Sequence, residues 1–224
     1  MNLARTFVLH LRKDLRLEWR SKDAANSMLF FALLVVVVFA FAFDPLAEES
    51  RRIAGGIAWV ALLFATIVAL NQGWARELRN GVLDALRLAP ASPNALFLGK
   101  VTANFLFVAL VECLVTPVFI VFYNLNVLGS GWQLLLVAVL GTWALVVNGT
   151  FFGALSIRTR NRELMLPLIL FPISLPALLG MVMATTDILT GERVPRDWIK
   201  LLTVYDIVFT VVSLLLFESI LGAE

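Results

Sequence analysis

Six long apolar runs, separated by short polar connections, leave this chain few possible folds. A helix needs about 20 mostly apolar residues to cross the hydrocarbon core of a bilayer. Windows of that kind cover residues 24–43, 53–70, 101–123, 132–155, 164–185 and 199–220. Backbone polar groups in lipid must be satisfied within their own segment, so each run is expected to be helical. The predicted fold class is an all-α integral membrane protein with six transmembrane helices.

The composition agrees with a membrane protein. Hydrophobic residues make up 60% of the 224 residues and charged residues 15%, which is far too apolar for a soluble domain of this length. The connections are too short to hold a soluble domain, so residues 1–224 are predicted to form a single transmembrane domain. The net charge of +2 does not indicate nucleic-acid binding, because the basic residues flank apolar runs. The single cysteine, Cys113, excludes an internal disulfide and a paired-cysteine metal site.

The distribution of lysine and arginine predicts the topology. Six lie before the first run, four in residues 71–100 and three in residues 156–163, so thirteen lie on one side. The loops on the other side hold the remaining five. Because cytoplasmic loops carry the excess of basic residues, both termini are predicted to be cytoplasmic.

Residues 1–22 are predicted to form an amphipathic helix in the interfacial layer of the membrane. Its apolar face carries Leu3, Phe7, Val8, Leu11, Leu15 and Trp19. Its basic face carries Arg5, Arg12, Lys13, Arg16 and Arg20. The basic face would meet anionic lipid or a cytoplasmic partner. The alternative is a solvated basic leader that only fixes the orientation.

Residues 71–100 form a charged loop that is long enough to hold a helix of its own. From Arg76 to Leu88, apolar and charged residues fall on opposite sides of a helical wheel. Pro90 and Pro93 would end this helix, because proline lacks the N–H donor and disfavours helical geometry at the residue before it. Asn94 or Ser92 can cap a new helix that runs through Lys100 into the next apolar run. From the wheel alone, a short amphipathic loop helix without a partner is an equal alternative.

The order of residues in this segment resembles the cytoplasmic segment of type-2 ABC exporter permeases. The matching residues are Glu77, Gly81, Leu83, Leu86, Pro90, Ser92, Leu96, Gly99 and Lys100. The resemblance implies a coupling helix that docks into a cleft on a separate ATPase subunit. The predicted ATPase-coupling interface comprises Glu77, Arg79, Gly81, Leu83, Leu86, Pro90 and Lys100.

A second cytoplasmic contact is predicted at Arg158, Arg160 and Arg162, although these residues serve equally well as a topology signal.

In the fifth run, Pro167, Pro172 and Pro176 each interrupt helical hydrogen bonding and predict a bent helix, which suits a hinge or static packing. Polar residues to note within the third, fourth and sixth runs are Asn104, Glu112, Asn148, Asp206 and Glu218. Glu112 is the most costly of these to bury, and no basic residue near it in sequence offers a partner.

The whole chain is similar to the B-type permease subunits of the cytochrome c maturation system. The resemblance rests on Asn26 with Phe30-Phe31, Gly56-Ile57-Ala58-Trp59-Val60, the coupling segment, and Phe171-Pro172-Ile173 with Leu175-Pro176 after an arginine-rich loop. It implies a permease of the bacterial inner membrane that pairs with a second copy of itself and two copies of the ATPase. The implied further partners are a haem-handling membrane subunit, a small membrane protein and a haem chaperone, with haem as the possible cargo. The resemblance also implies that ATP hydrolysis by the ATPase subunit is coupled to haem handling or to release of the haem-loaded chaperone.

The motifs that the chain lacks also bear on its function. It contains no GxxxxGK[ST] motif, so ATP is expected on the partner subunit. The only histidine, His10, precedes the first run, so no histidine pair can ligate haem iron within the membrane. No catalytic residue, bound cofactor or metal site is predicted. The alternatives are a type-2 permease for a lipid-linked sugar or a drug, a secondary carrier, or a membrane scaffold.

Overall fold

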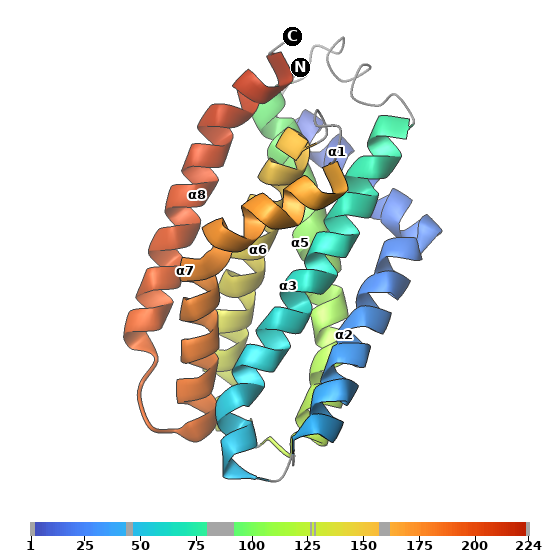
Figure 1. Cartoon of the computed structure of the whole chain (residues 1–224). Coiled ribbons are helices and arrows are strands. Elements are labelled where there is room, and N and C mark those ends of the chain that lie inside the picture. The colour runs from blue at the N-terminus through green and yellow to red at the C-terminus, as the bar shows by residue number, and fades with distance from the viewer. Residues whose placement is uncertain are drawn as a thin grey trace.

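The computed structural model describes residues 3–43, 47–79, 92–125, 127, 129–156 and 162–222, and these residues form helices joined by short connections (Figure 1). The helices are α1 (Leu3–Ser21), α2 (Asp23–Ala42), α3 (Glu48–Arg79), α5 (Pro93–Phe122), α6 (Gly131–Ser156), α7 (Arg162–Thr190) and α8 (Arg196–Gly222). All of them except α1 contain a segment long and apolar enough to cross a membrane. The predicted all-α fold with six spans is therefore confirmed.

Two of the helices extend well beyond their predicted apolar runs. Helix α3 continues from residue 70 to Arg79. Helix α5 begins at Pro93 with Ser92 as its N-cap and runs through Lys100 into the third apolar run, as predicted. Pro93 is compatible with this start, because a proline in the first helical turn loses no hydrogen bond that the helix would otherwise make. With 32 residues, α3 is about 48 Å long, against about 30 Å for the hydrocarbon core of a bilayer. The two ends of the predicted coupling segment are thus helical extensions of spans, and residues 80–91 between them lie outside the described residues.

Helices α3 and α6 are the most buried spans, and glycines in α6 hold them close together. A Cβ atom on Gly149 would overlap Cδ1 of Leu70, and one on Gly153 would lie 2.5 Å from Cδ1 of Trp74. Trp59 occupies the corresponding space beside Gly141. Glycines allow this approach because they have no side chain between the two backbones. Such close packing matters in lipid, where no hydrophobic force drives helices together.

Helix α1 packs mainly against α5, at the end of the bundle where α3 ends (Figure 1). The last turns of α8 lie at the same end, so helix α1 and the C-terminal end of α8 lie at one end of the bundle (Figure 1). Helix α7 is continuous through its three prolines and changes direction along its length (Figure 1).

Candidate functional site

Four charged residues from three helices meet where α1 crosses the ends of α3 and α5. We name Lys13, Asp14, Glu77 and Lys100 the ion-pair cluster. Glu77 is only 6% exposed, and its Oε1 atom accepts hydrogen bonds from Lys100 Nζ at 2.7 Å and from Lys13 Nζ at 3.1 Å. Asp14 contacts the same two cations, with Oδ1 at 3.0 Å from Lys13 Nζ and Oδ2 at 3.7 Å from Lys100 Nζ. Two cations and two anions leave the cluster without net charge, which is the condition for burying ions at tolerable cost.

Gly99 allows the helices to come close enough for these contacts. A Cβ atom at position 99 would lie 3.0 Å from Cβ of His10 and 3.2 Å from the carbonyl oxygen of Phe7. The α1 backbone therefore rests almost directly on the α5 backbone, which places the next residue, Lys100, against α1. The Lys100 ammonium also lies 4.5 Å from the ring centroid of Trp74, a cation–π contact with α3.

The electrostatics of α1 follow from this packing. Burial disfavours the charged form of Lys13, but the carboxylates of Glu77 and Asp14 outweigh burial and raise the pKa of Lys13 above its ordinary value. Burial lowers the pKa of His10, and the positive charge of Lys13 lowers it further, against the opposing effect of Asp14. His10 is therefore held towards its neutral form at the contact with Gly99.

A second ion pair joins Glu18 of α1 to Arg76 of α3. With the cluster, it gives α1 two points of ionic contact with the last turns of α3.

The face of α1 that contacts the bundle overlaps the predicted apolar face only in part, where Phe7, Leu11 and Leu15 are half-buried. Thr6 is buried, and His10, Lys13 and Asp14 are half-buried, whereas Val8 and Trp19 of the apolar face are 53% and 73% exposed. The contact face thus runs along one edge of the apolar face and carries polar residues. Lys13 belongs to the predicted basic face, but its side chain packs against the bundle and binds Glu77. Arg12, Arg16 and Arg20 of the same face are exposed. These contacts do not fit a solvated leader, and the interfacial location of α1 stays a prediction.

Only part of the predicted coupling interface falls within the described residues. Glu77 and Lys100, 23 positions apart, are brought together by the fold. Gly81, Leu83, Leu86 and Pro90 lie outside the described residues, as does the side chain of Arg79. Arg158 and Arg160 also lie outside them, and Arg162 is described only as the first residue of α7. The docking surface stays a prediction, and Glu77 is buried in the ion-pair cluster rather than exposed at an edge.

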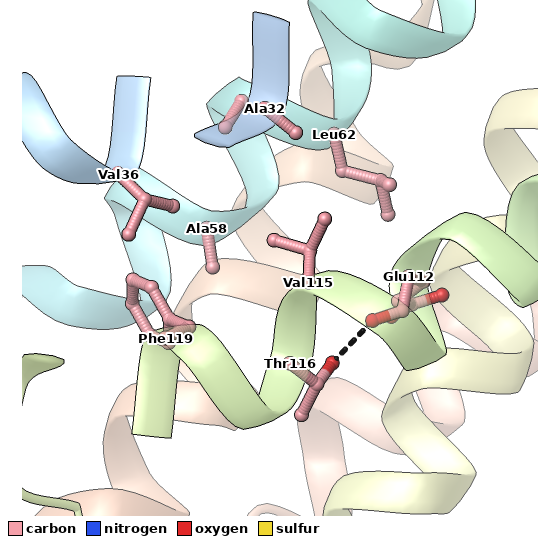
Figure 2. Close-up of a pocket in the computed structure, with 9 residues that line it drawn as sticks. Ala32, Val36, Ala58, Leu62, Glu112, Val115, Thr116 and Phe119 are labelled. Atoms are coloured by element: carbon pink, nitrogen blue, oxygen red, sulfur yellow. Dashed lines mark hydrogen bonds between the residues drawn. The ribbon is translucent and has the colours of Figure 1, made fainter. Parts of the chain in front are cut away.

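Glu112, the intramembrane acid, borders a cavity of about 70 Å³ between α2, α3 and α5 (Figure 2). Apolar side chains such as Ala58, Leu62 and Phe119 form most of its wall. The Thr142 hydroxyl of α6 donates a hydrogen bond of 2.6 Å to Glu112 Oε2, which identifies the partner that the sequence did not reveal. A carboxyl hydrogen-bonded between two packed helices fits a structural role.

The proline-rich helix α7 receives a hydrogen bond from α8 between two of its prolines. The Tyr205 hydroxyl donates to the carbonyl of Ile173 at 2.8 Å, and Asn148 Nδ2 of α6 donates to the same hydroxyl at 2.8 Å. This chain of bonds joins three spans at the stretch bounded by Pro172 and Pro176. Sequence reasoning singled out Asn148 but missed Tyr205, although a tyrosine within an apolar run signals a hydroxyl that needs a partner.

Other contributors were also missed from the sequence. His10, Asp14 and Trp74 have no distinctive local pattern, whereas the Gly149 and Gly153 pair has the small-xxx-small spacing that is readable in any apolar run. Within the described residues, no three histidine, cysteine or acidic side chains are placed to hold a metal ion.

Comparison with known proteins identifies the relatives of this chain. The family model described as CcmB protein matches residues 5–220. Heme exporter protein B of Rhodobacter capsulatus is 35% identical over 169 residues, which cover 75% of this chain and 77% of that protein. Heme exporter protein B of Paracoccus denitrificans is 32% identical over 75% of this chain and 77% of its own length. The Pseudomonas aeruginosa protein of the same name is 30% identical over 79% of each chain.

Proposed function

Because the chain belongs to the CcmB protein family, we propose that it is the membrane permease subunit of an ABC transporter complex for cytochrome c maturation. The observation that carries this function is the family match over nearly the whole chain, together with relatives named heme exporter protein B. The six spans agree with a permease. The chain is not itself an enzyme, and a separate ATPase subunit supplies the energy.

The complex contains two copies of the ATPase and two copies of this chain. A haem-handling membrane subunit, a small membrane protein and a haem chaperone complete the system, and ATP binds only to the ATPase. The complex resides in the bacterial inner membrane with both termini of this chain in the cytoplasm. The thirteen basic residues on that side support this orientation.

The mechanism is transmission of an ATP-driven movement from the coupling segment to the spans. Closure of the two ATPase subunits pushes on residues 76–88, and the push enters α3 and α5 through their helical extensions. The other end of α3 is attached to α7. Trp59 Nε1 donates to Thr185 Oγ1 of α7 at 2.9 Å, and Arg52 pairs at 2.6 Å with Glu192, two residues beyond the end of α7. Through these contacts, a movement of the cytoplasmic end of α3 would be transmitted to the outer end of α7.

The proposed function is tested in host cells that lack this gene, with covalent c-type cytochromes detected by a haem stain. The stain is expected to disappear and to return when the gene is restored. An unchanged stain would remove haem from the proposal and leave a permease for another cargo.

The docking model is tested by Gly81→Trp, which is expected to abolish the stain while the protein remains at normal amounts in the membrane. The matched control is Gly129→Trp in the connection between α5 and α6, where a Cβ atom added to the glycine would have no neighbouring atom within 4 Å. Normal cytochrome assembly with Gly81→Trp would refute docking of the segment at Gly81.

A further inference from the structure

We propose that α1 forms one rigid block with the last turns of α3 and the first turns of α5, and that Glu77 is the positioning residue that holds this block together. The proposal rests on the proposed coupling function, because the block carries both ends of the coupling segment. It gives α1 a part in energy transmission beyond fixing the orientation of the chain.

A single carboxylate oxygen joins the three helices. Glu77 at the end of α3 binds Lys13 of α1 and Lys100 of α5 through Oε1, at 3.1 and 2.7 Å. Asp14 binds the same two lysines from the side of α1. Removing one member leaves an uncompensated charge in a buried setting, which is far more costly than removing an oppositely charged pair together.

The close contact at Gly99 restricts relative sliding of α1 and α5, because only a glycine leaves room for the α1 backbone. Cβ of His10 and the backbone of Phe7 already fill the space that a side chain at position 99 would occupy. Helix α1 is thus held to α5 by backbone contact at Gly99. It is held to α3 by the ion pairs of Glu77 with Lys13 and of Arg76 with Glu18.

The function of the block follows from where it lies. Residues 80–91 leave the block at α3 and return to it at α5, so the two anchor points of the coupling segment are fixed to each other. A push on the segment is then delivered to α3 and α5 together. Helix α1 moves with them and carries its exposed Arg12, Arg16 and Arg20 along the membrane surface.

The charge arrangement is tested by a double-mutant cycle with Glu77→Gln, Lys100→Gln and the pair combined. Each single variant leaves one unbalanced buried charge, and the double variant restores balance. We expect each single variant to lower cytochrome output per molecule of membrane protein by about tenfold, and the double variant to recover most of that loss. ATPase activity of the purified complex should persist in the single variants, because the defect lies in transmission. Wild-type output from the single variants, or a double variant whose loss is the product of the two single losses, would overturn the proposal.

Rigidity is tested independently by a cross-link. The two cysteines are introduced by His10→Cys and Gly99→Cys in a Cys113→Ser background. Their Cβ atoms would start 3.0 Å apart and would need to separate by about half an ångström to reach the Cβ–Cβ distance of a disulfide. The oxidised complex in nanodiscs is expected to keep ATP-dependent chaperone release within about twofold of the same complex after reduction, since the twofold margin is close to 0.4 kcal/mol. Gly99→Cys without the His10 substitution is the control for the added Cβ atom at position 99. Activity of the doubly substituted complex that returns only on reduction would overturn the proposal.

The proposed function and the rigid block fail in different experiments. Failure of the proposed function is read from the strain lacking the gene, whose haem stain would be unchanged. Failure of the rigid block is read from the variants in a strain where the wild-type gene restores the stain. The cross-link still tests the block if a glutamine variant does not accumulate in the membrane.

Discussion

Replacing Tyr205 by phenylalanine removes one oxygen atom that joins α6, α7 and α8. Phenylalanine keeps the aromatic ring, whose centroid lies 4.2 Å from that of Phe209, so apolar packing is preserved. What is lost is the hydrogen bond to the carbonyl of Ile173 and the one received from Asn148. Asn148 Nδ2 retains its bond to the carbonyl of Ala144, whereas the Ile173 carbonyl loses the donor provided by α8.

The cost of this substitution can be worked from the two lost bonds. Hydrogen bonds between transmembrane helices contribute on average about 0.6 kcal/mol each and at most about 1.7 kcal/mol. Tyr205→Phe is therefore expected to lower the free energy of unfolding by about 1.2 kcal/mol, with an upper bound of about 3 kcal/mol if neither bond is replaced. Pro172 and Pro176 do not change this range, because the N–H groups that they lack would bond to the carbonyls of Leu168 and Pro172 rather than to that of Ile173.

The assay is equilibrium unfolding of the purified protein from mild detergent micelles by added denaturing detergent. The control is Thr210→Val, which removes a single hydrogen bond of 3.1 Å from Trp143 between α6 and α8 and is expected to cost about 0.6 kcal/mol. If Tyr205→Phe costs no more than Thr210→Val, the hydroxyl does not stabilise the proline-rich stretch and the reasoning is wrong.

Two further predictions concern packing and pH. Gly149→Ala and Gly153→Ala are each expected to destabilise the contact between α3 and α6 by about 1–3 kcal/mol through overpacking, measured by the same unfolding assay. Gly73→Ala in α3, with nothing within 4 Å, should instead be neutral or stabilising by about 0.5–1 kcal/mol, and equal losses at all three sites would contradict the packing argument. Because the folded pKa of His10 lies below its ordinary value of 6.5, its contribution to stability is full above pH 6.5 and is lost as the pH falls towards the folded pKa. His10→Gln should flatten this part of the stability profile as the pH is lowered through 6.5, and an unchanged slope would show that other groups cause it.

The spans were predictable because the bilayer imposes a local rule. Length and apolar content decide whether a segment crosses, and both can be counted along the chain. The start of α5 was predictable from its candidate capping residues, Ser92 and Asn94, but the end of α3 was not. Helix α3 continues to Arg79 through a polar stretch in which Arg76, Glu77 and Leu78 form helices well, so hydropathy marks only where the apolar part of the helix ends.

The candidate site was predictable only in part. The order of residues drew attention to Glu77 and Lys100, but as members of a docking surface. The structure instead places Glu77 in a buried cluster with Lys13, which lies 64 positions away in the sequence. Helical periodicity put Lys13 on a basic face, and no local rule distinguishes it there from Arg12 or Arg16.

The sequence by itself determined that this chain is a bundle of six spans with a charged segment between the second and third, because each span must satisfy its own backbone and remain apolar in lipid. Tertiary structure decided which polar groups meet. Thr142 binds Glu112, Tyr205 binds Ile173, and Glu77 binds two lysines. The physical reason is that lipid is as apolar as the spans themselves, so neighbours are chosen by shape and by hydrogen bonds between helices. Those choices depend on pairs of residues far apart in the chain.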